Sequence, residues 1–140
     1  MGSSDQDGRA TLDAARGWVE VLGLDLLEVS AGSVVAQWDI DARHLQPQGI
    51  VHGGVYASVV ETCCSVGAAA AAPPGTRVVG VENHTSFVRA VRDGQLSARA
   101  VPLHAGRRAQ LWECVISDAE GRLIATGRLR VLCVDAGQEK

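Results

Sequence analysis

Residues 49–72 read GIVHGGVYASVVETCCSVGAAAAA, and this stretch decides the fold. Past the His-Gly-Gly opening, nearly every side chain is apolar or small, and the one charge is Glu61. A helix that is apolar all round belongs inside a protein core. The segment APPGTR ends the helix, because its two prolines cannot continue one. The sequence therefore predicts a long buried helix with a carboxylate in its middle.

The 20 residues from Gly53 to Ala72 would also be long enough to cross a bilayer. Against that alternative stand Glu61, several hydroxyl side chains and the absence of Leu, Ile and Phe. A carboxylate at the centre of a bilayer is unfavourable. We therefore favour a helix in a protein core and expect no membrane partner.

The flanking segments predict strands and one further helix. Residues 11–22 have apolar positions spaced by three and four, as in a short amphipathic helix. Residues 24–40 indicate two strands joined at Ala31-Gly32. Four more strand-like segments follow the long helix, at residues 77–91, 94–106, 107–119 and 122–135. Because a lone apolar helix needs a sheet to wrap it, the predicted fold class is α+β.

Length and composition indicate one globular domain. The 140 residues carry 16 acidic and 13 basic side chains, a net charge of −3 that gives no overall attraction to nucleic acid. We expect a disordered segment at residues 1–9, one domain at 10–134 and a flexible tail at 135–140. The opening segment MGSSDQDGRA lacks the apolar core of a signal peptide.

The four cysteines do not form a disulfide pattern. Cys63 and Cys64 are adjacent, Cys114 and Cys133 lie far apart, and no Cys-x-x-Cys occurs. Reduced thiols fit a cytoplasmic protein. The cysteines and histidines also lack a recognised metal-ligand spacing, so no metal site is expected.

The segment LQPQGIVHGGVYASVVETCCSVGA, residues 45–68, resembles the motif of hotdog-fold acyl-CoA thioesterases. The likeness is greatest to the 4-hydroxybenzoyl-CoA and phenylacetate-pathway types that use a catalytic glutamate, and it covers residues 20–134. The resemblance implies a curved antiparallel sheet around the long helix. It also implies homodimers paired edge to edge, which often form homotetramers. By position, the active-site residues it implies are Gln46, His52, Gly53, Glu61 and Ser65, where family members commonly carry Thr in place of Ser65.

Thioester hydrolysis needs a group that polarises the carbonyl and a group that supplies oxygen. The free amide of Gly53 at a helix N-terminus suits the first task, although Gly53-Gly54 would also suit a tight turn. A buried Glu61 suits the second task, as general base on water or as nucleophile. The alternatives for Glu61 are an exposed helix position, for which the helix is too apolar, or an acid paired with an arginine.

Three further polar side chains have alternatives of their own. Gln46 holds water or the thioester oxygen, or it caps loop backbone groups. His52 more often orients the turn than titrates. Ser65 lies one turn after Glu61 on the same face, where it holds the carboxylate or bonds back to the helix.

Substrate-binding candidates lie outside the long helix as well. Arg107 and Arg108, with Arg89, are candidates for the coenzyme A phosphates, or else form a solvated strand end. Because neighbours in a strand face opposite sides, we expect only one of Arg107 and Arg108 to face the ligand. Tyr56 and Phe87 are candidates for stacking on an aryl group.

The function that these residues favour is hydrolysis of an acyl- or aryl-CoA thioester, with coenzyme A as part of the substrate and no other cofactor. The alternatives are a non-catalytic acyl-CoA-binding hotdog protein and a hotdog dehydratase or hydratase, whose Asp-x-Asn-Pro-x-His signature is absent. Eight residues of helix, about 12 Å, separate Gly53 from Glu61. We therefore expect each active site to be shared between two antiparallel helices of a dimer.

Overall fold

The computed structural model describes residues 17–137 of the chain. The predicted disordered segment 1–9 and the end of the predicted tail lie outside the described residues. Most of the predicted helix at 11–22 does so too, and its last part is helix α2, Trp18–Leu22. The flexible tail was expected to begin at residue 135. In the structure Asp135 still belongs to the sheet, where it pairs with Thr76.

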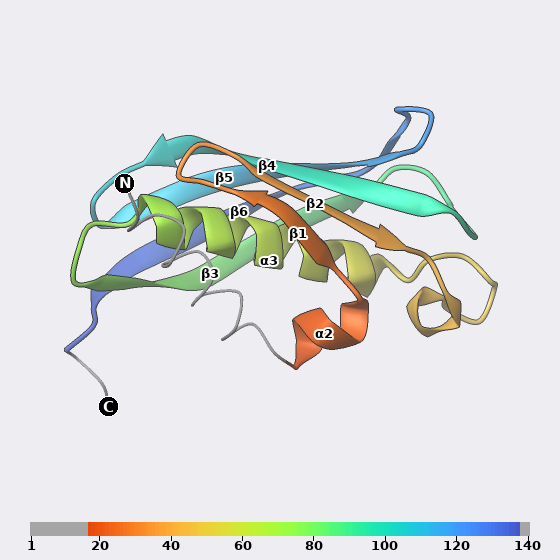
Figure 1. Cartoon of the computed structure of the whole chain (residues 1–140), viewed down its shortest axis with the longest axis horizontal. Coiled ribbons are helices and arrows are strands. Elements are labelled where there is room, and N and C mark those ends of the chain that lie inside the picture. The colour runs from red at the N-terminus through yellow and green to blue at the C-terminus, as the bar shows by residue number, and fades with distance from the viewer. Residues whose placement is uncertain (1–16, 138–140) are drawn as a thin grey trace.

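Six strands form one antiparallel sheet in the order β1-β2-β4-β5-β6-β3. Their bounds are β1 Asp25–Val29, β2 Val34–Asp39, β3 Thr76–Phe87, β4 Gln95–Ala105, β5 Ala109–Asp118 and β6 Leu123–Asp135. The twisted sheet covers one side of the long helix α3, Gly53–Ala71 (Figure 1). The predicted α+β hotdog arrangement is confirmed.

Two segments differ in detail from the prediction. The loop at 41–49 contains a short 3-10 helix, η1 (Ala42–His44), because the Asp41 carboxylate accepts the Arg43 backbone N–H at 2.9 Å and caps it. Strand β3 ends at Phe87 instead of residue 91. The backbone amides of residues 88 and 89 then both donate to the Ile124 carbonyl.

The inner side of α3 packs closely on the sheet. The ring of Trp112 lies where a side chain on Gly67 would be, so the glycine lets the helix approach. The buried Gln110 donates its amide to the Ala68 carbonyl at 3.0 Å and accepts the Trp112 indole N–H at 2.7 Å. This chain of hydrogen bonds ties the last turns of α3 to β5. It also satisfies polar groups that would be costly to bury alone.

Strand β5 shows the predicted alternation. Its inward side chains, Gln110, Trp112, Cys114 and Ile116, are buried, whereas Val115 between them is exposed. Burial of the inward face is what an antiparallel sheet covered on one side requires.

The outer side of α3 was predicted wrongly. The sheet leaves one side of the helix uncovered, and Gly54, Ser58, Glu61 and Ser65 follow one another along it. We call these four residues the open stripe. Length and composition alone would also suit a membrane span, but the opposite side of α3 is buried against the sheet, as in a core helix. The helix is thus a core helix with one polar, uncovered side.

Candidate active site

Gln46 is the first residue of the tight turn in a narrow loop that leads into α3. Leu45 and Val51 pair across the base of this loop, and the Gln46 backbone N–H donates to Ile50. The side-chain oxygen of Gln46 accepts the backbone N–H of Gln48, so the predicted capping of loop backbone is realised. The carboxamide nitrogen of Gln46 makes no hydrogen bond with the described part of the chain.

His52 is the N-cap of α3. Its Nδ1 accepts the backbone N–H of Gly54 at 2.8 Å, and its carbonyl accepts that of Val55. With Nδ1 as acceptor, the ring proton sits on Nε2 in the neutral form. The structure therefore uses His52 to orient the turn, the role that the sequence favoured.

Gly53, the first residue of α3, lies directly against Phe87. A Cβ atom on Gly53 would overlap the Phe87 ring. Phe87 also lies beside Tyr56, with ring centroids 6.0 Å apart, within the usual range for aromatic pairs. Tyr56 is buried and Phe87 is 58% exposed, so of these two predicted residues only Phe87 can offer a ring face to a ligand.

Glu61 is exposed, which corrects the prediction that it is enclosed in the core. It forms no ion pair with another described residue, so the predicted alternative of an arginine-paired acid is also wrong for this chain. The carboxylate borders a hollow of about 380 Å³ between α3 and β3, lined by Ala57, Ser58, Glu61, Asn83, Thr85 and Phe87. This volume lies within the range of small-molecule sites.

Two residues of this hollow were missed by sequence reasoning. Asn83 donates its amide to the Ala57 carbonyl at 2.9 Å, and Thr85 donates its hydroxyl to the Asn83 side chain at 2.7 Å. The pair ties β3 to α3 one turn before Glu61. The polar run ENHTS within a strand was the available signal.

Ser65 lies on the open stripe with Glu61, as its spacing predicted. It makes no hydrogen bond within the described residues. The hydroxyl that bonds back to the helix is instead Ser58, which donates to the Gly54 carbonyl at 2.7 Å. Ser58 also accepts the indole N–H of Trp18 at 2.8 Å, so α2 contacts the open stripe.

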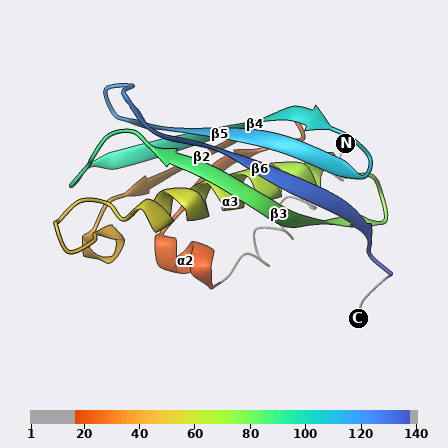
Figure 2. The same cartoon turned by 180° about the vertical axis from the view of Figure 1, so that it is seen from behind.

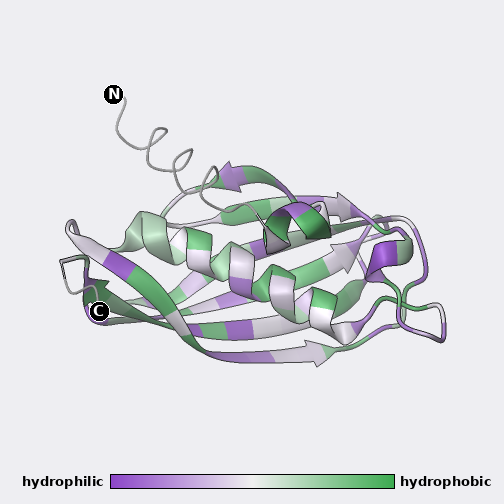
Figure 3. Ribbon diagram, turned by 90° about the horizontal axis from the view of Figure 1, so that it is seen from below, coloured by the Kyte–Doolittle hydropathy of each residue, from purple (hydrophilic) through white to green (hydrophobic). Residues whose placement is uncertain are grey.

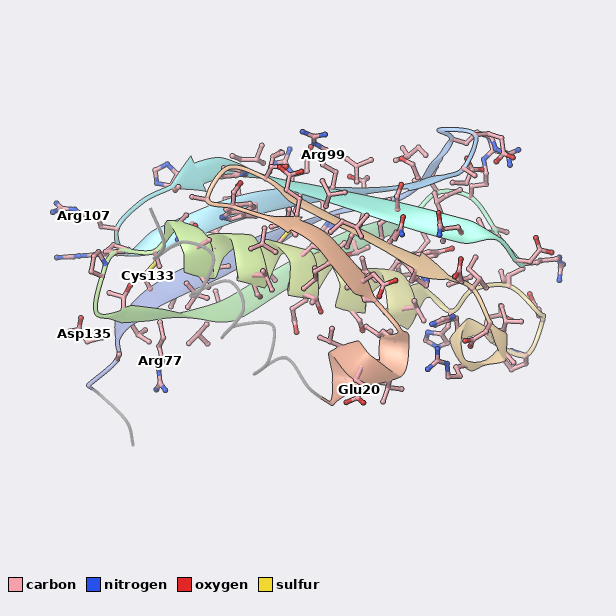
Figure 4. The ribbon with its side chains drawn as sticks, viewed as in Figure 1. Glu20, Arg77, Arg99, Arg107, Cys133 and Asp135 are labelled. Atoms are coloured by element: carbon pink, nitrogen blue, oxygen red, sulfur yellow. The ribbon has the colours of Figure 1, made fainter. Side chains whose placement is uncertain are left out.

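The arginines lie at two ends of α3. Arg107 and Arg108 are exposed in the turn before β5. Figure 4 shows Arg107 near the end of α3. Since the strand begins only at Ala109, strand alternation does not decide which of the two arginines would face a ligand, and that expectation stays a prediction. Arg89 follows β3 near the start of α3, where Arg92 donates to the Gln48 carbonyl at 3.0 Å. One chain therefore does not bring Arg89 and Arg107 together.

The cysteines lie away from this hollow. Cys63, Cys64 and Cys114 are buried, and all four cysteines are free, as predicted. Burial raises the pKa of the Cys64 thiol, which makes a thiolate less accessible. Within residues 17–137, no three His, Cys, Asp or Glu side chains gather as a metal site would require.

A family model described as "Thioesterase superfamily" matches residues 48–125. Rv1847 of Mycobacterium tuberculosis is 38% identical over 133 residues, which cover 93% of this chain and 95% of that protein. Its solved structure has a TM-score of 0.81 at 39% identity and covers 85% of this chain and 97% of that one.

Two further relatives have names that describe reactions. The proofreading thioesterase EntH of Cronobacter turicensis is 40% identical and covers 79% of this chain and 81% of that protein. The 1,4-dihydroxy-2-naphthoyl-CoA hydrolase of Listeria monocytogenes is 30% identical and covers 82% of this chain and 94% of that protein. The predicted resemblance and the predicted enzyme class, a thioester hydrolase, are confirmed.

Proposed function

The chain belongs to the thioesterase superfamily, and on that premise we propose that it hydrolyses an acyl-CoA thioester to a free acid and coenzyme A. Glu61 either activates the attacking water as a general base or attacks the carbonyl as a nucleophile. The Gly53 amide polarises the thioester carbonyl. The observation that supports this proposal most is an unpaired carboxylate beside a hollow of about 380 Å³.

One chain cannot hold both groups at one carbonyl. Gly53 and Glu61 are separated by about 12 Å of helix, whereas a nucleophile must come within roughly 3.5 Å of the carbonyl carbon. A site built from the Gly53 of one chain and the Glu61 of a second chain removes this difficulty. Two α3 helices would then run antiparallel about a two-fold axis.

One of the two edges of the sheet, strand β3, offers a place for that pairing. Strand β3 pairs with β6 on one side, and no described strand pairs with it on the other (Figure 2). Its side chains Val79 and Val81 are 45% and 50% exposed. Long exposed strand edges readily pair with a second chain. A two-fold axis level with Ala57, midway between Gly53 and Glu61, would pass close to Asn83 on β3.

For Gln46, His52 and Ser65 we propose roles that follow from where each lies relative to α3. Gln46 and His52 serve with Gly53 at the start of α3, where the free carboxamide nitrogen of Gln46 is suited to donate to the thioester oxygen or to hold water. Ser65 serves with Glu61 on the open stripe. The reaction consumes water and needs no cofactor. The cytoplasmic location and the lack of nucleic-acid and membrane partners stay predictions.

The test is release of free thiol from acyl-CoA substrates by the wild-type chain and two variants. Glu61→Gln should lower kcat by about 100-fold or more, as expected for loss of a general base or nucleophile. Glu28→Gln, which changes an exposed glutamate on β1, is the matched control and should keep wild-type kcat. Near-normal turnover by Glu61→Gln would show that Glu61 is not catalytic.

A further inference from the structure

A side-chain hydrogen bond joins the edge strand β3 to α3 at the turn that precedes Glu61. The amide nitrogen Nδ2 of Asn83 donates to the Ala57 carbonyl at 2.9 Å. In an α-helix the carbonyl of residue 57 also accepts the backbone N–H of residue 61. Asn83 is therefore bonded to the same oxygen that the backbone of Glu61 uses, and both residues line the hollow described above.

A second hydrogen bond fixes the orientation of the Asn83 amide. Since the Ala57 carbonyl can only accept, Nδ2 faces it, and Oδ1 is left to accept the Thr85 hydroxyl at 2.7 Å. Thr85 is itself seated on β6, because its hydroxyl oxygen lies where a Cβ atom on Gly127 would be. The two bonds thus connect α3 through β3 to the next strand of the sheet.

The place of this connection coincides with the proposed dimer axis. Seen from the uncovered side of α3, β3 runs along one side of the helix and α2 lies on the other (Figure 3). In the dimer proposed above, the two β3 strands meet at an axis close to Asn83. In one chain Asn83 is exposed, and water competes with its hydrogen bond. Pairing of β3 with its copy would cover this bond, and exclusion of water strengthens it.

A two-fold axis doubles any slide of α3 along β3. When both helices slide by the same distance within their own chains, the symmetry moves them in opposite directions past each other. The gap between Gly53 of one chain and Glu61 of the other then changes by twice the slide. A slide of about 0.5 Å would therefore displace these groups by about 1 Å, and a misplacement of that size can lower a rate by about 100-fold.

We propose that Asn83 is a positioning residue that sets where α3 lies along β3, and thereby the distance between Gly53 of one chain and Glu61 of its partner. This inference rests on the proposed hydrolysis of thioesters in a shared site. The Asn83 amide is bonded at both ends, to Ala57 and to Thr85, so it acts through α3 and not on the substrate. Thr85 supports it by holding the amide in the orientation that donates to the helix.

The kinetic test is release of free thiol from hexanoyl-CoA and from benzoyl-CoA. Asn83→Ala should lower kcat by about 10-fold or more and change KM less than about threefold, because the groups that bind the substrate remain while their alignment is lost. His84→Ala is the matched control. It changes the next residue of β3, whose exposed side chain lies on the opposite face of the strand, and it should keep wild-type kcat.

Two variants of Thr85 separate its hydroxyl from its packing on Gly127. Thr85→Ser keeps the hydroxyl and should keep wild-type kcat. Thr85→Val keeps the shape and loses the hydroxyl, so it should lower kcat in the same direction as Asn83→Ala but by a smaller factor. Equal kcat values for the two Thr85 variants would contradict the supporting role of this hydroxyl.

Crystal structures of the wild type and of Asn83→Ala give a readout that does not depend on turnover. We expect α3 to lie at a different place along β3 in the variant, displaced in opposite directions in the two chains of the dimer. If Asn83→Ala does not fold, Asn83→Leu replaces it, since leucine has a similar branched shape and no donor.

An unshifted α3, a kcat near that of the wild type, or a loss that falls mainly on KM would overturn the role of Asn83. So would a wild-type dimer in which β3 does not lie at the two-fold axis. If the wild type hydrolyses neither ester, the proposed function fails for these substrates, and the position of α3 in the two crystal structures then decides the role of Asn83 separately.

Discussion

Phe87 and Gly53 are in direct contact, although 34 positions separate them in the sequence, and the contact leaves no room for a side chain on Gly53. The ring of Phe87 therefore borders the amide that is proposed to polarise the substrate. Any group added at Gly53 has to displace that ring.

Gly53→Ala should accordingly lower kcat/KM by about 10-fold or more, because the methyl group moves Phe87 and narrows the approach to the amide. In a Phe87→Ala background the added cost of Gly53→Ala should shrink, since the two effects share one contact. Steady-state kinetics of the two single variants and the double variant measure this coupling. Gly32→Ala, at a glycine with nothing within 4 Å, is the control. Additive effects of Gly53→Ala and Phe87→Ala would contradict the shared contact.

A shared active site predicts complementation between two inactive chains. One chain carries Glu61→Ala, and the other carries Gln46→Ala together with Gly53→Ala. Each mixed dimer has one intact and one damaged site, so a random mixture should recover about a quarter of wild-type activity. Mass spectrometry under native conditions verifies the mixed dimers. Verified mixed dimers that stay inactive, from parents that fold, would rule out the shared site.

The arginines at the two ends of α3 predict a selective effect on coenzyme A esters. Loss of one charge-assisted hydrogen bond to a phosphate should raise KM by about 10-fold or more. Alanine at Arg107 or Arg108, or at Arg89, should raise KM for acyl-CoA in this way and spare the corresponding acyl-cysteamine, which lacks the phosphates. Arg99→Ala on β4 is the control, since Arg99 points away from α3 (Figure 4). An equal rise for both kinds of ester would place these arginines outside the nucleotide site.

The Tyr56 phenol should lose its proton only at unusually high pH. Burial raises its pKa to about 12, and its hydroxyl finds no hydrogen-bond partner in the described structure. In the unfolded chain the same phenol ionises near pH 10, so the unfolded state loses a proton that the folded state keeps. The free energy of unfolding should therefore fall as the pH rises from about 10 to about 12.

The near-ultraviolet absorbance of phenolate measures this directly, because Tyr56 is the only tyrosine. The folded chain should show its phenolate step near pH 12, and the chain in concentrated urea should show it near pH 10. Tyr56→Phe should abolish the step and remove this part of the pH dependence of stability. A step near pH 10 in the folded chain would show that Tyr56 is accessible to solvent.

The local pattern of the sequence predicted the helices and strands well. It failed to predict which side of α3 the sheet covers, because that depends on pairing between strands far apart in the sequence. Prolines end α3 and Ala31-Gly32 joins the first hairpin, because both act within a few residues. The exposure of Glu61 depends on which side of α3 the sheet leaves open. Gly54 and the alanines of α3 made the helix look apolar on every side in the sequence. Part of the surface at these small residues is nevertheless left uncovered by the sheet.

The hydrogen bond from Gln110 to the Ala68 carbonyl sets the rotational phase of α3 about its own axis. Successive residues of a helix point about 100° apart, so a slip by one residue would turn Glu61 away from the uncovered side. Gln110 touches neither the hollow nor any residue of the open stripe. The direction in which Glu61 points is thus fixed in part from the buried side of α3, opposite the open stripe. Loss of the Gln110 amide would therefore loosen the last turns of α3 on β5, although Gln110 and Glu61 share no contact.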